Sequence, residues 1–199
     1  MAALSRSDLW SLEEYAERRP GFRAQVLEHK KKRQLALGEH ARLYFEDALT
    51  IRYQIQEMLR IEKVFESAAI NEELEAYNPL IPDGSNWKAT FMIEYEDPAE
   101  REVQLQKLLG IEDKVWLQVE DCDRVWPIAD EDLDRSRDTK TSSVHFLRFE
   151  LTLAMVAAVQ QGAGISAGID HPRYPVDAFE LPADVRDSLA ADLVATPLN

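Results

Sequence analysis

The chain has 199 residues, of which 45% are hydrophobic and 30% charged, a composition typical of one ordinary folded domain and not of a disordered chain. Its formal net charge of −14 repels the phosphate backbone of nucleic acids and anionic membrane surfaces, so we expect neither as a partner. No apolar run is long enough for a signal peptide or a membrane span, which predicts a cytoplasmic protein.

The only cysteine, Cys122, limits the cofactors that the chain could hold. One thiol excludes an internal disulfide and any self-contained iron–sulfur or multi-cysteine zinc site. Cys122 lies between Asp121 and Asp123, whose negative charges disfavour a reactive thiolate. Because the flanking segments alternate apolar and polar residues, we expect Cys122 in the turn of a hairpin.

The N-terminal segment is predicted to be helical. Ser11 and Glu14 have the spacing of a capping box, and Pro20 is expected to close that short helix and open the next one. The basic run 29–33, "HKKKR", suits the carbonyl end of the second helix.

The pattern from residue 49 to about residue 69 predicts the longest helix of the protein. At about 100° per residue, its apolar positions form one stripe. These positions are Ile51, Ile55, Met58, Phe65 and Ala69. Glu62 falls within the same stripe. Since a buried carboxylate is costly unless it is paired, we expect Glu62 to meet a partner such as Arg148, Lys88 or a histidine, most simply in a structural ion pair.

The rest of the chain predicts an antiparallel sheet with further helices. A helix is expected from Glu72 to the prolines of "YNPLIPDG", and residues 87–95 alternate apolar and polar side chains as a half-buried strand does. The following elements are a helix from Pro98 to Gly110, the hairpin, a strand near residues 144–150, an apolar helix, a strand near residues 164–171 and a last helix near residues 183–194. No internal repeat or linker interrupts them. The prediction is one α+β domain over residues 1–199, with a mostly antiparallel sheet packed against several helices.

The acidic segment "IADEDLDRSRDT" resembles a calcium-binding loop only at its first positions. Arg135 stands where such a loop needs glycine, and Thr141 stands where it needs a bidentate glutamate. We therefore interpret Asp130, Glu131 and Asp132 as charges at the start of a short helix.

The stretch "TKTSSVHFLRFELT" carries the most candidate chemistry. Strand alternation places His145 on one face and both Arg148 and Glu150 on the other. Arg148 and Glu150 could pair with each other or with a neighbouring strand, and Arg148 or Lys88 could orient an anionic ligand. The polar residues 140–143 add hydrogen-bond donors but lack the glycines of a phosphate loop. The candidate ligand-binding residues are Arg148, Glu150, Lys88 and Glu62.

His171 ends its own strand much as His145 begins another. A metal site made of His145, His171 and Glu62 requires those two strand ends to be adjacent. Parallel neighbours would hold them about 20 Å apart, whereas an antiparallel pair would bring them together. The sequence allows both arrangements, and two structural histidines are the simpler interpretation.

Long strings in the chain resemble a known family. "LYFEDALTIRYQIQEMLRIEKVFE", "EELEAYNPLIPDGSNWKATFMIEY" and "TSSVHFLRFEL" are similar to the bacterial domain-of-unknown-function family 3501, and the likeness extends over nearly the whole chain. This resemblance brings no catalytic residues. It implies a redox setting, because members are often encoded beside rubrerythrin-like proteins and iron–sulfur oxidoreductases.

Two functions follow as hypotheses, and the catalytic residues, if any, are unknown. The first is an accessory protein that binds a rubrerythrin-like or iron–sulfur redox partner through exposed aromatic side chains. The candidates for such anchors are Trp10, Trp116 and Trp126. The alternative is a small metal-dependent enzyme or metal carrier that uses His145, His171 and Glu62.

Overall fold

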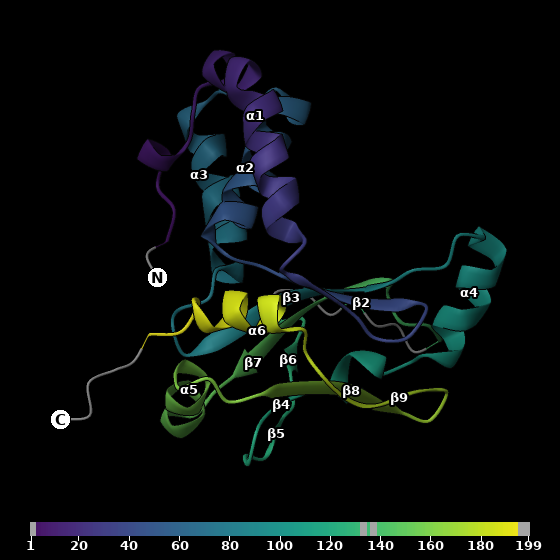
Figure 1. Cartoon of the computed structure of the whole chain (residues 1–199). Helices are drawn as coiled ribbons and strands as arrows, with labels where there is room; N and C mark the ends of the chain where they lie inside the picture. Colours follow the sequence, from purple (N-terminus) through teal and green to yellow (C-terminus); the bar gives the residue numbers. More distant parts are fainter. Residues whose placement is uncertain (1–2, 132–134, 136–138, 195–199) are drawn as a thin grey trace.

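The computed structural model describes residues 3–131, 135 and 139–194. In it, two antiparallel sheets face each other, and three N-terminal helices stand on the outer side of one sheet (Figure 1). The helices are α1 (Leu12–Lys30), α2 (Ala48–Glu62), α3 (Ser67–Tyr77), α4 (Pro98–Lys107), α5 (Leu153–Gln160) and α6 (Ala183–Ala190), with short 3-10 helices η1 (Arg6–Asp8), η2 (Asn78–Leu80) and η3 (Ile111–Lys114). The strands are β1 (Gln34–Ala36), β2 (Ala41–Phe45), β3 (Asn86–Ile93), β4 (Val115–Val119), β5 (Arg124–Val125), β6 (Ile128–Ala129), β7 (Val144–Glu150), β8 (Ile165–His171) and β9 (Tyr174–Glu180). The predicted α+β class with antiparallel sheets is confirmed.

Among the described residues, every strand pair is antiparallel. The five-stranded sheet has the order β1-β2-β3-β7-β6, and the four-stranded sheet has the order β5-β4-β8-β9. In the first sheet, β3 pairs with β7 so that Lys88 lies opposite Arg148 and Phe91 lies opposite His145. The expected hairpin around Cys122 is present as β4 and β5.

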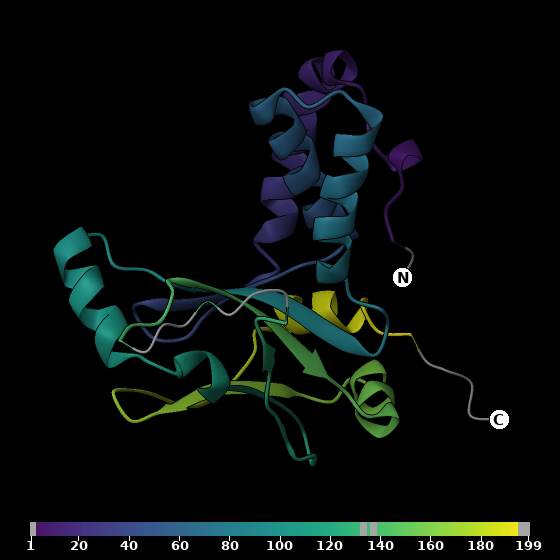
Figure 2. The same cartoon turned by 180° about the vertical axis from the view of Figure 1, so that it is seen from behind.

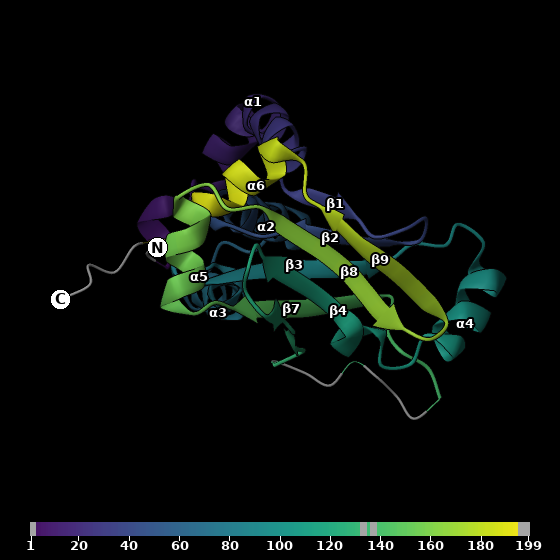
Figure 3. The ribbon, with the colours of Figure 1, turned by 60° about the horizontal axis from the view of Figure 1, so that its bottom comes forward.

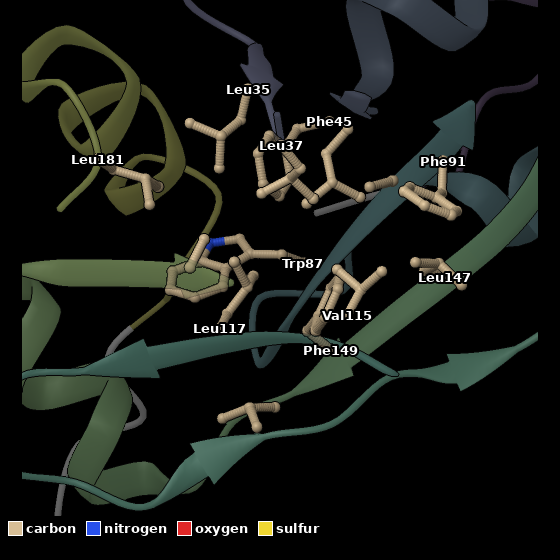
Figure 4. Packing of buried hydrophobic residues seen from close by; sticks show 14 of the residues in the cluster. Leu35, Leu37, Phe45, Trp87, Phe91, Val115, Leu117, Leu147, Phe149 and Leu181 are labelled. Atoms are coloured by element: carbon tan, nitrogen blue, oxygen red, sulfur yellow. The ribbon is translucent and has the colours of Figure 1, made fainter. Parts of the chain in front are cut away.

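The main core lies between the two sheets. Figure 3 shows β4, β8 and β9 in front of β2, β3 and β7, and Figure 4 shows the side chains that meet between them. Trp87 of β3, Leu117 of β4 and Phe149 of β7 belong to this cluster. The buried indole of Trp87 also donates a hydrogen bond of 2.9 Å to the carbonyl of Leu189 in α6, so its polar atom is satisfied. One face of β3 and β7 therefore belongs to the core and the other faces outward.

Helices α1, α2 and α3 form a second layer on that outward face (Figures 1 and 2). Ile51 and Ile55 of α2 pack with Leu74 of α3 in a separate apolar cluster. Ser11 caps α1 as predicted, because its side chain accepts a hydrogen bond from the backbone N–H of Glu14.

Two predicted helix boundaries are wrong. Pro20 does not divide α1, which runs from Leu12 to Lys30, although proline removes one backbone donor from the helix. Phe22 and Val26 are buried after it, so tertiary packing holds the helix together across this position. The long helix expected over residues 49–69 ends instead at Glu62, because Lys63 adopts a left-handed conformation with φ of 56° and the chain turns before α3.

The connection through α5 also differs from both arrangements that we considered. Strands β7 and β8, which α5 joins, belong to different sheets and are not neighbours. Helix α5 connects one sheet to the other and buries Met155, Val156 and Val159 in the main core. This short connection therefore does not need the length of a crossover between parallel neighbours.

Of the helices that the structure describes, none is both long enough and apolar enough to span a membrane.

Candidate functional site

The outward face of the five-stranded sheet presents polar side chains beneath α2 and α3. Residues of β3 alternate between buried and partly exposed, as do those of β7. This alternation directs Lys88 and Thr90 of β3 outward, next to Phe146 and Arg148 of β7. Because Lys88 and Arg148 are register partners, two cationic side chains start from adjacent positions on the same face.

A cavity of about 670 Å³ lies between this face and the helices. Its apolar wall consists of Met58, Ala76, Tyr77, Pro79, Leu80, Ala89, Phe146 and Leu147. Its polar wall consists of Lys88, Arg148, Arg135, Glu46, Glu73, Glu75 and Glu131. A neighbouring cavity of about 330 Å³ shares four of these side chains. An apolar wall with a few convergent polar groups is the usual make-up of a small-molecule site.

Arg148 is held in place by two carboxylates. Its Nε and Nη2 atoms donate to the two carboxylate oxygens of Glu131, each at 2.8 Å, and its Nη1 donates to Glu150. The hydrogen bonds that Arg148 donates to Glu131 and Glu150 raise the pKa of Arg148, although burial opposes this effect. The guanidinium is therefore a fixed positive charge at the edge of the cavity.

Lys88 is half-buried, and its charge is less well balanced than that of Arg148. Its Nζ donates one hydrogen bond to the carbonyl oxygen of Pro79 and, among the described residues, forms no ion pair. Burial lowers the pKa of Lys88, and the charge of Arg148 lowers it further, against the opposing effects of Asp83 and nearby glutamates. Lys88 is thus an amine with spare hydrogen-bond donors in the wall of the cavity.

Two glutamates that line the cavity, Glu46 and Glu73, differ in their surroundings. Glu46 accepts hydrogen bonds from the hydroxyls of Thr50 at 2.6 Å and Thr90 at 2.8 Å. Burial raises the pKa of Glu73 on α3, an effect to which Glu62 contributes. The carboxylate oxygens of Glu46 are thus occupied by hydroxyl donors, and burial disfavours the charged form of Glu73.

Three of the four predicted ligand-binding residues come together in this region. Lys88 and Arg148 line the cavity, and Glu150 pairs with Arg148. Glu62 does not join them, and the expectation that it faces the core is wrong. Glu62 is exposed at the end of α2, because the helix stops there and the apolar stripe does not continue to Phe65, which is 73% exposed.

His145 lies in a separate, buried polar network. Its side chain is fully buried, and its Nδ1 lies 2.6 Å from a carboxylate oxygen of Asp130. Its Nε2 lies 2.8 Å from the hydroxyl of Thr141 and 3.1 Å from the carbonyl oxygen of Ser142. The Thr141 hydroxyl donates in turn to Glu112 at 3.0 Å. Both ring nitrogens of His145 therefore form hydrogen bonds, and these bonds attach the loop before β7 to the sheet.

His171 ends β8 in the other sheet, where its Nε2 donates to the carbonyl of Leu109 at 3.2 Å and its Nδ1 accepts from the backbone N–H of Arg173. Among the described residues, no group of three or more histidine, cysteine, aspartate or glutamate side chains could hold a metal ion. The structure therefore does not gather His145, His171 and Glu62 into one site.

The three candidate tryptophan anchors differ in exposure. Trp116 is buried and donates to Asp170 at 3.0 Å, while Trp10 is partly covered by the guanidinium of Arg52, 4.1 Å from its ring centre. Trp126 is 43% exposed, and Ile128 of the edge strand β6 is exposed to the same extent.

Sequence reasoning missed the partners that complete these sites. Asp130 and Glu131 come from the acidic segment, which gave no sign of contact with His145 or Arg148. The helix predicted there falls largely on residues outside the described part of the chain, and Asp130 itself has a left-handed φ of 50°. Only the opposite charge of Glu131 and Arg148 could have suggested their pairing.

Comparison with known proteins agrees with this architecture. The sequence profile of the family described as protein of unknown function DUF3501 matches residues 3–193. The chain belongs to the DUF3501 family. This DUF3501 protein is similar to a novel protein of unknown function from Burkholderia pseudomallei K96243, whose crystal structure is known. The two sequences are 53% identical, and the match covers 97% of this chain and 100% of the other chain, with a TM-score of 0.93. A search among curated proteins found no match.

Proposed function

We propose that the protein binds a small organic acid in the cavity between α2, α3 and the outward face of the five-stranded sheet. The observation that carries this proposal is Lys88, a half-buried ammonium with one hydrogen bond and no ion pair among the described residues, beside the fixed charge of Arg148. A carboxylate or phosphate would accept the remaining N–H groups of Lys88. The apolar body of the ligand would lie against Tyr77 and Phe146.

Binding of benzoate and phenyl phosphate, each compared with the neutral benzamide, tests this proposal by calorimetry. We expect the acids to bind more tightly than the amide. Lys88→Met should weaken acid binding by roughly 10- to 100-fold, because a hydrogen bond to a charged group contributes about 1.5–3 kcal/mol.

Lys140→Met is the matched control for this experiment. Lys140 pairs with Glu102 at 3.6 Å and does not line the cavity, so its variant should bind acids as the wild type does. Equal affinity for acids and amide, or an equal loss in both variants, would contradict the proposal.

A role as an accessory protein for a redox partner is a second candidate, and the exposed pair Trp126 and Ile128 supports it. Trp126 lies in the short link between β5 and β6, and Ile128 lies in β6, the two-residue edge strand of the five-stranded sheet. A rubrerythrin-like or iron–sulfur partner, as the family resemblance implies, would dock there. Trp126→Ala should then weaken capture of such a purified partner, whereas Leu153→Ser, at an exposed position on α5, should not. Equal capture by both variants would exclude this surface.

The metal-dependent alternative has no comparable support. Its three ligands lie at the end of α2 and on strands of different sheets, and the histidine nitrogens already have hydrogen-bond partners.

A further inference from the structure

We propose that Lys88 forms a reversible imine with a carbonyl group of the bound ligand, which narrows the ligand class to small aldehydes and oxo acids. This inference rests on the proposed function, since it concerns the same cavity. It adds a covalent step to what would otherwise be simple recognition of an anion.

The position of Lys88 suits a nucleophilic amine. The side chain leaves the first half of β3, a central strand. Lys88 pairs with Arg148 of β7, and its carbonyl accepts a hydrogen bond of 2.8 Å from the backbone N–H of Glu46, so its backbone is held on both sides. Its Nζ is oriented by one hydrogen bond to the Pro79 carbonyl. It lines the 670 Å³ cavity, which offers room for a ligand beside it. A lysine in a tight ion pair with a carboxylate would be less able to reach a ligand. Among the described residues, no carboxylate lies within ion-pair distance of Lys88.

The surroundings of Lys88 make the loss of its proton easier than for an exposed lysine. Burial and the neighbouring Arg148 both lower the pKa of Lys88, whereas Asp83, Glu131 and Glu150 raise it. Arg148 remains charged because its carboxylate partners raise its own pKa. A desolvated lysine next to a second cation is the arrangement that activates an amine as a nucleophile.

The chemistry needs no oxidant, metal or cofactor. The lone pair of the neutral amine attacks the carbonyl carbon, a C–N bond forms, and the carbonyl oxygen takes a proton to give a carbinolamine. Loss of the hydroxyl group as water then gives the C=N bond, with protons exchanged through solvent. The sum is amine plus carbonyl giving imine plus water, and hydrolysis reverses it. The anionic group of the ligand would meanwhile lie near Arg148.

Borohydride trapping tests the proposal with pyridoxal 5′-phosphate as the probe, because this molecule carries both an aldehyde and a phosphate. Reduction converts the imine into a stable secondary amine, which peptide mapping by mass spectrometry locates. At a low ratio of probe to protein, we expect Lys88 to be the main labelled residue. Its labelling should also persist to lower pH than that of exposed lysines, because a lowered pKa leaves more neutral amine.

Two variants make the result decisive. Lys88→Arg keeps the charge but cannot form an imine, so the main label should disappear while circular dichroism shows an unchanged fold. Lys140→Arg should be labelled as the wild type is. Labelling spread over exposed lysines, or labelling unchanged in Lys88→Arg, would overturn the inference.

Benzoate separates this inference from the proposed function, since it has no aldehyde or ketone group. If wild-type protein binds benzoate but Lys88 is not trapped, the imine is excluded and acid binding stands. If Lys88 is trapped but neither benzoate nor phenyl phosphate binds, Lys88 is a reactive amine and the proposal of a general acid-binding site is wrong.

Discussion

Individual polar residues connect segments that are distant in the sequence. Glu57 of α2 is an example, because its carboxylate accepts hydrogen bonds from the Tyr15 hydroxyl and from Arg19 Nε, each at 2.7 Å. Arg60 on the next turn adds a weaker contact at 3.3 Å. The side chain of Glu57 is only 14% exposed, so this network is shielded from water. It attaches α1 to α2 beside the apolar cluster that contains Tyr15 and Phe22.

The ionisation of Glu57 should make stability dependent on pH. The hydrogen bonds from Arg19 hold the pKa of Glu57 at about 2, below its usual 4.5. The contribution of the carboxylate is therefore complete above pH 4.5 and is lost as the pH falls towards 2. Glu57→Gln should lower the free energy of unfolding by about 1–3 kcal/mol at neutral pH. In urea denaturation, the difference from wild type should shrink as the pH is lowered towards about 3.

The control for Glu57 is Glu14→Gln. Glu14 forms an exposed pair with Arg18 at 3.8 Å, and such a pair contributes less than about 1 kcal/mol. A difference between Glu57→Gln and wild type that stays constant from neutral to acidic pH would show that the carboxylate of Glu57 is not specifically stabilised.

At the scale of elements, the turn between α2 and α3 determines the shape of the helical layer. The chain ends α2 with Lys63 in the left-handed region, at φ of 56°, instead of with the glycine that this position favours. The missing glycine is the reason that the sequence predicts one long helix. The same turn leaves Phe65 exposed and lets α3 return to cover the cavity.

Lys63→Gly should stabilise the protein. The substitution removes the steric cost of a left-handed side-chain residue, about 1 kcal/mol, and raises the melting temperature in a thermal scan. Gln54→Gly, at an exposed position inside α2, should have the opposite effect and cost about 1 kcal/mol. A melting temperature that falls in Lys63→Gly would indicate that the turn does not need this conformation.

For the whole molecule, buried Arg33 connects the helical layer, the sheet and the C-terminal helix. Only 2% of its side chain is exposed. It donates to the carbonyl of Phe45 at the end of β2, and to both carboxylate oxygens of Asp192 after α6. Its Nε also lies 3.3 Å from Asp47, the residue that caps α2. The helical layer, the five-stranded sheet and the segment after α6 are therefore all in contact with the guanidinium of Arg33.

Arg33→Ala should be strongly destabilising, because it leaves the carboxylate of Asp192 buried without its partner. We expect a loss of about 3–5 kcal/mol in the free energy of unfolding, measured with urea. Arg23→Ala, at an exposed position of α1, should change it by less than about 0.5 kcal/mol. Similar effects of the two variants would show that the Arg33 network does not connect the layers.

The sequence by itself determined the local features of this protein. Strand alternation correctly placed His145 on the face of β7 opposite to that of Arg148 and Glu150, and it correctly predicted a half-buried strand that contains Trp87. The Ser11 cap and the hairpin at Cys122 were also predictable, because each depends on residues that are close in the chain. The α+β class follows from the same local patterns.

Only the tertiary structure decided which of these faces meet. The assignment of β7 and β8 to different sheets separates His145 from His171, and the pairing of β3 with β7 places Lys88 beside Arg148. The cavity exists because α2 and α3 cover that outward face, and Lys63 directs their turn without a sequence signal. Periodicity reports which side of an element is apolar, whereas strand order and side-chain partners depend on contacts between distant segments. Those contacts created the candidate site.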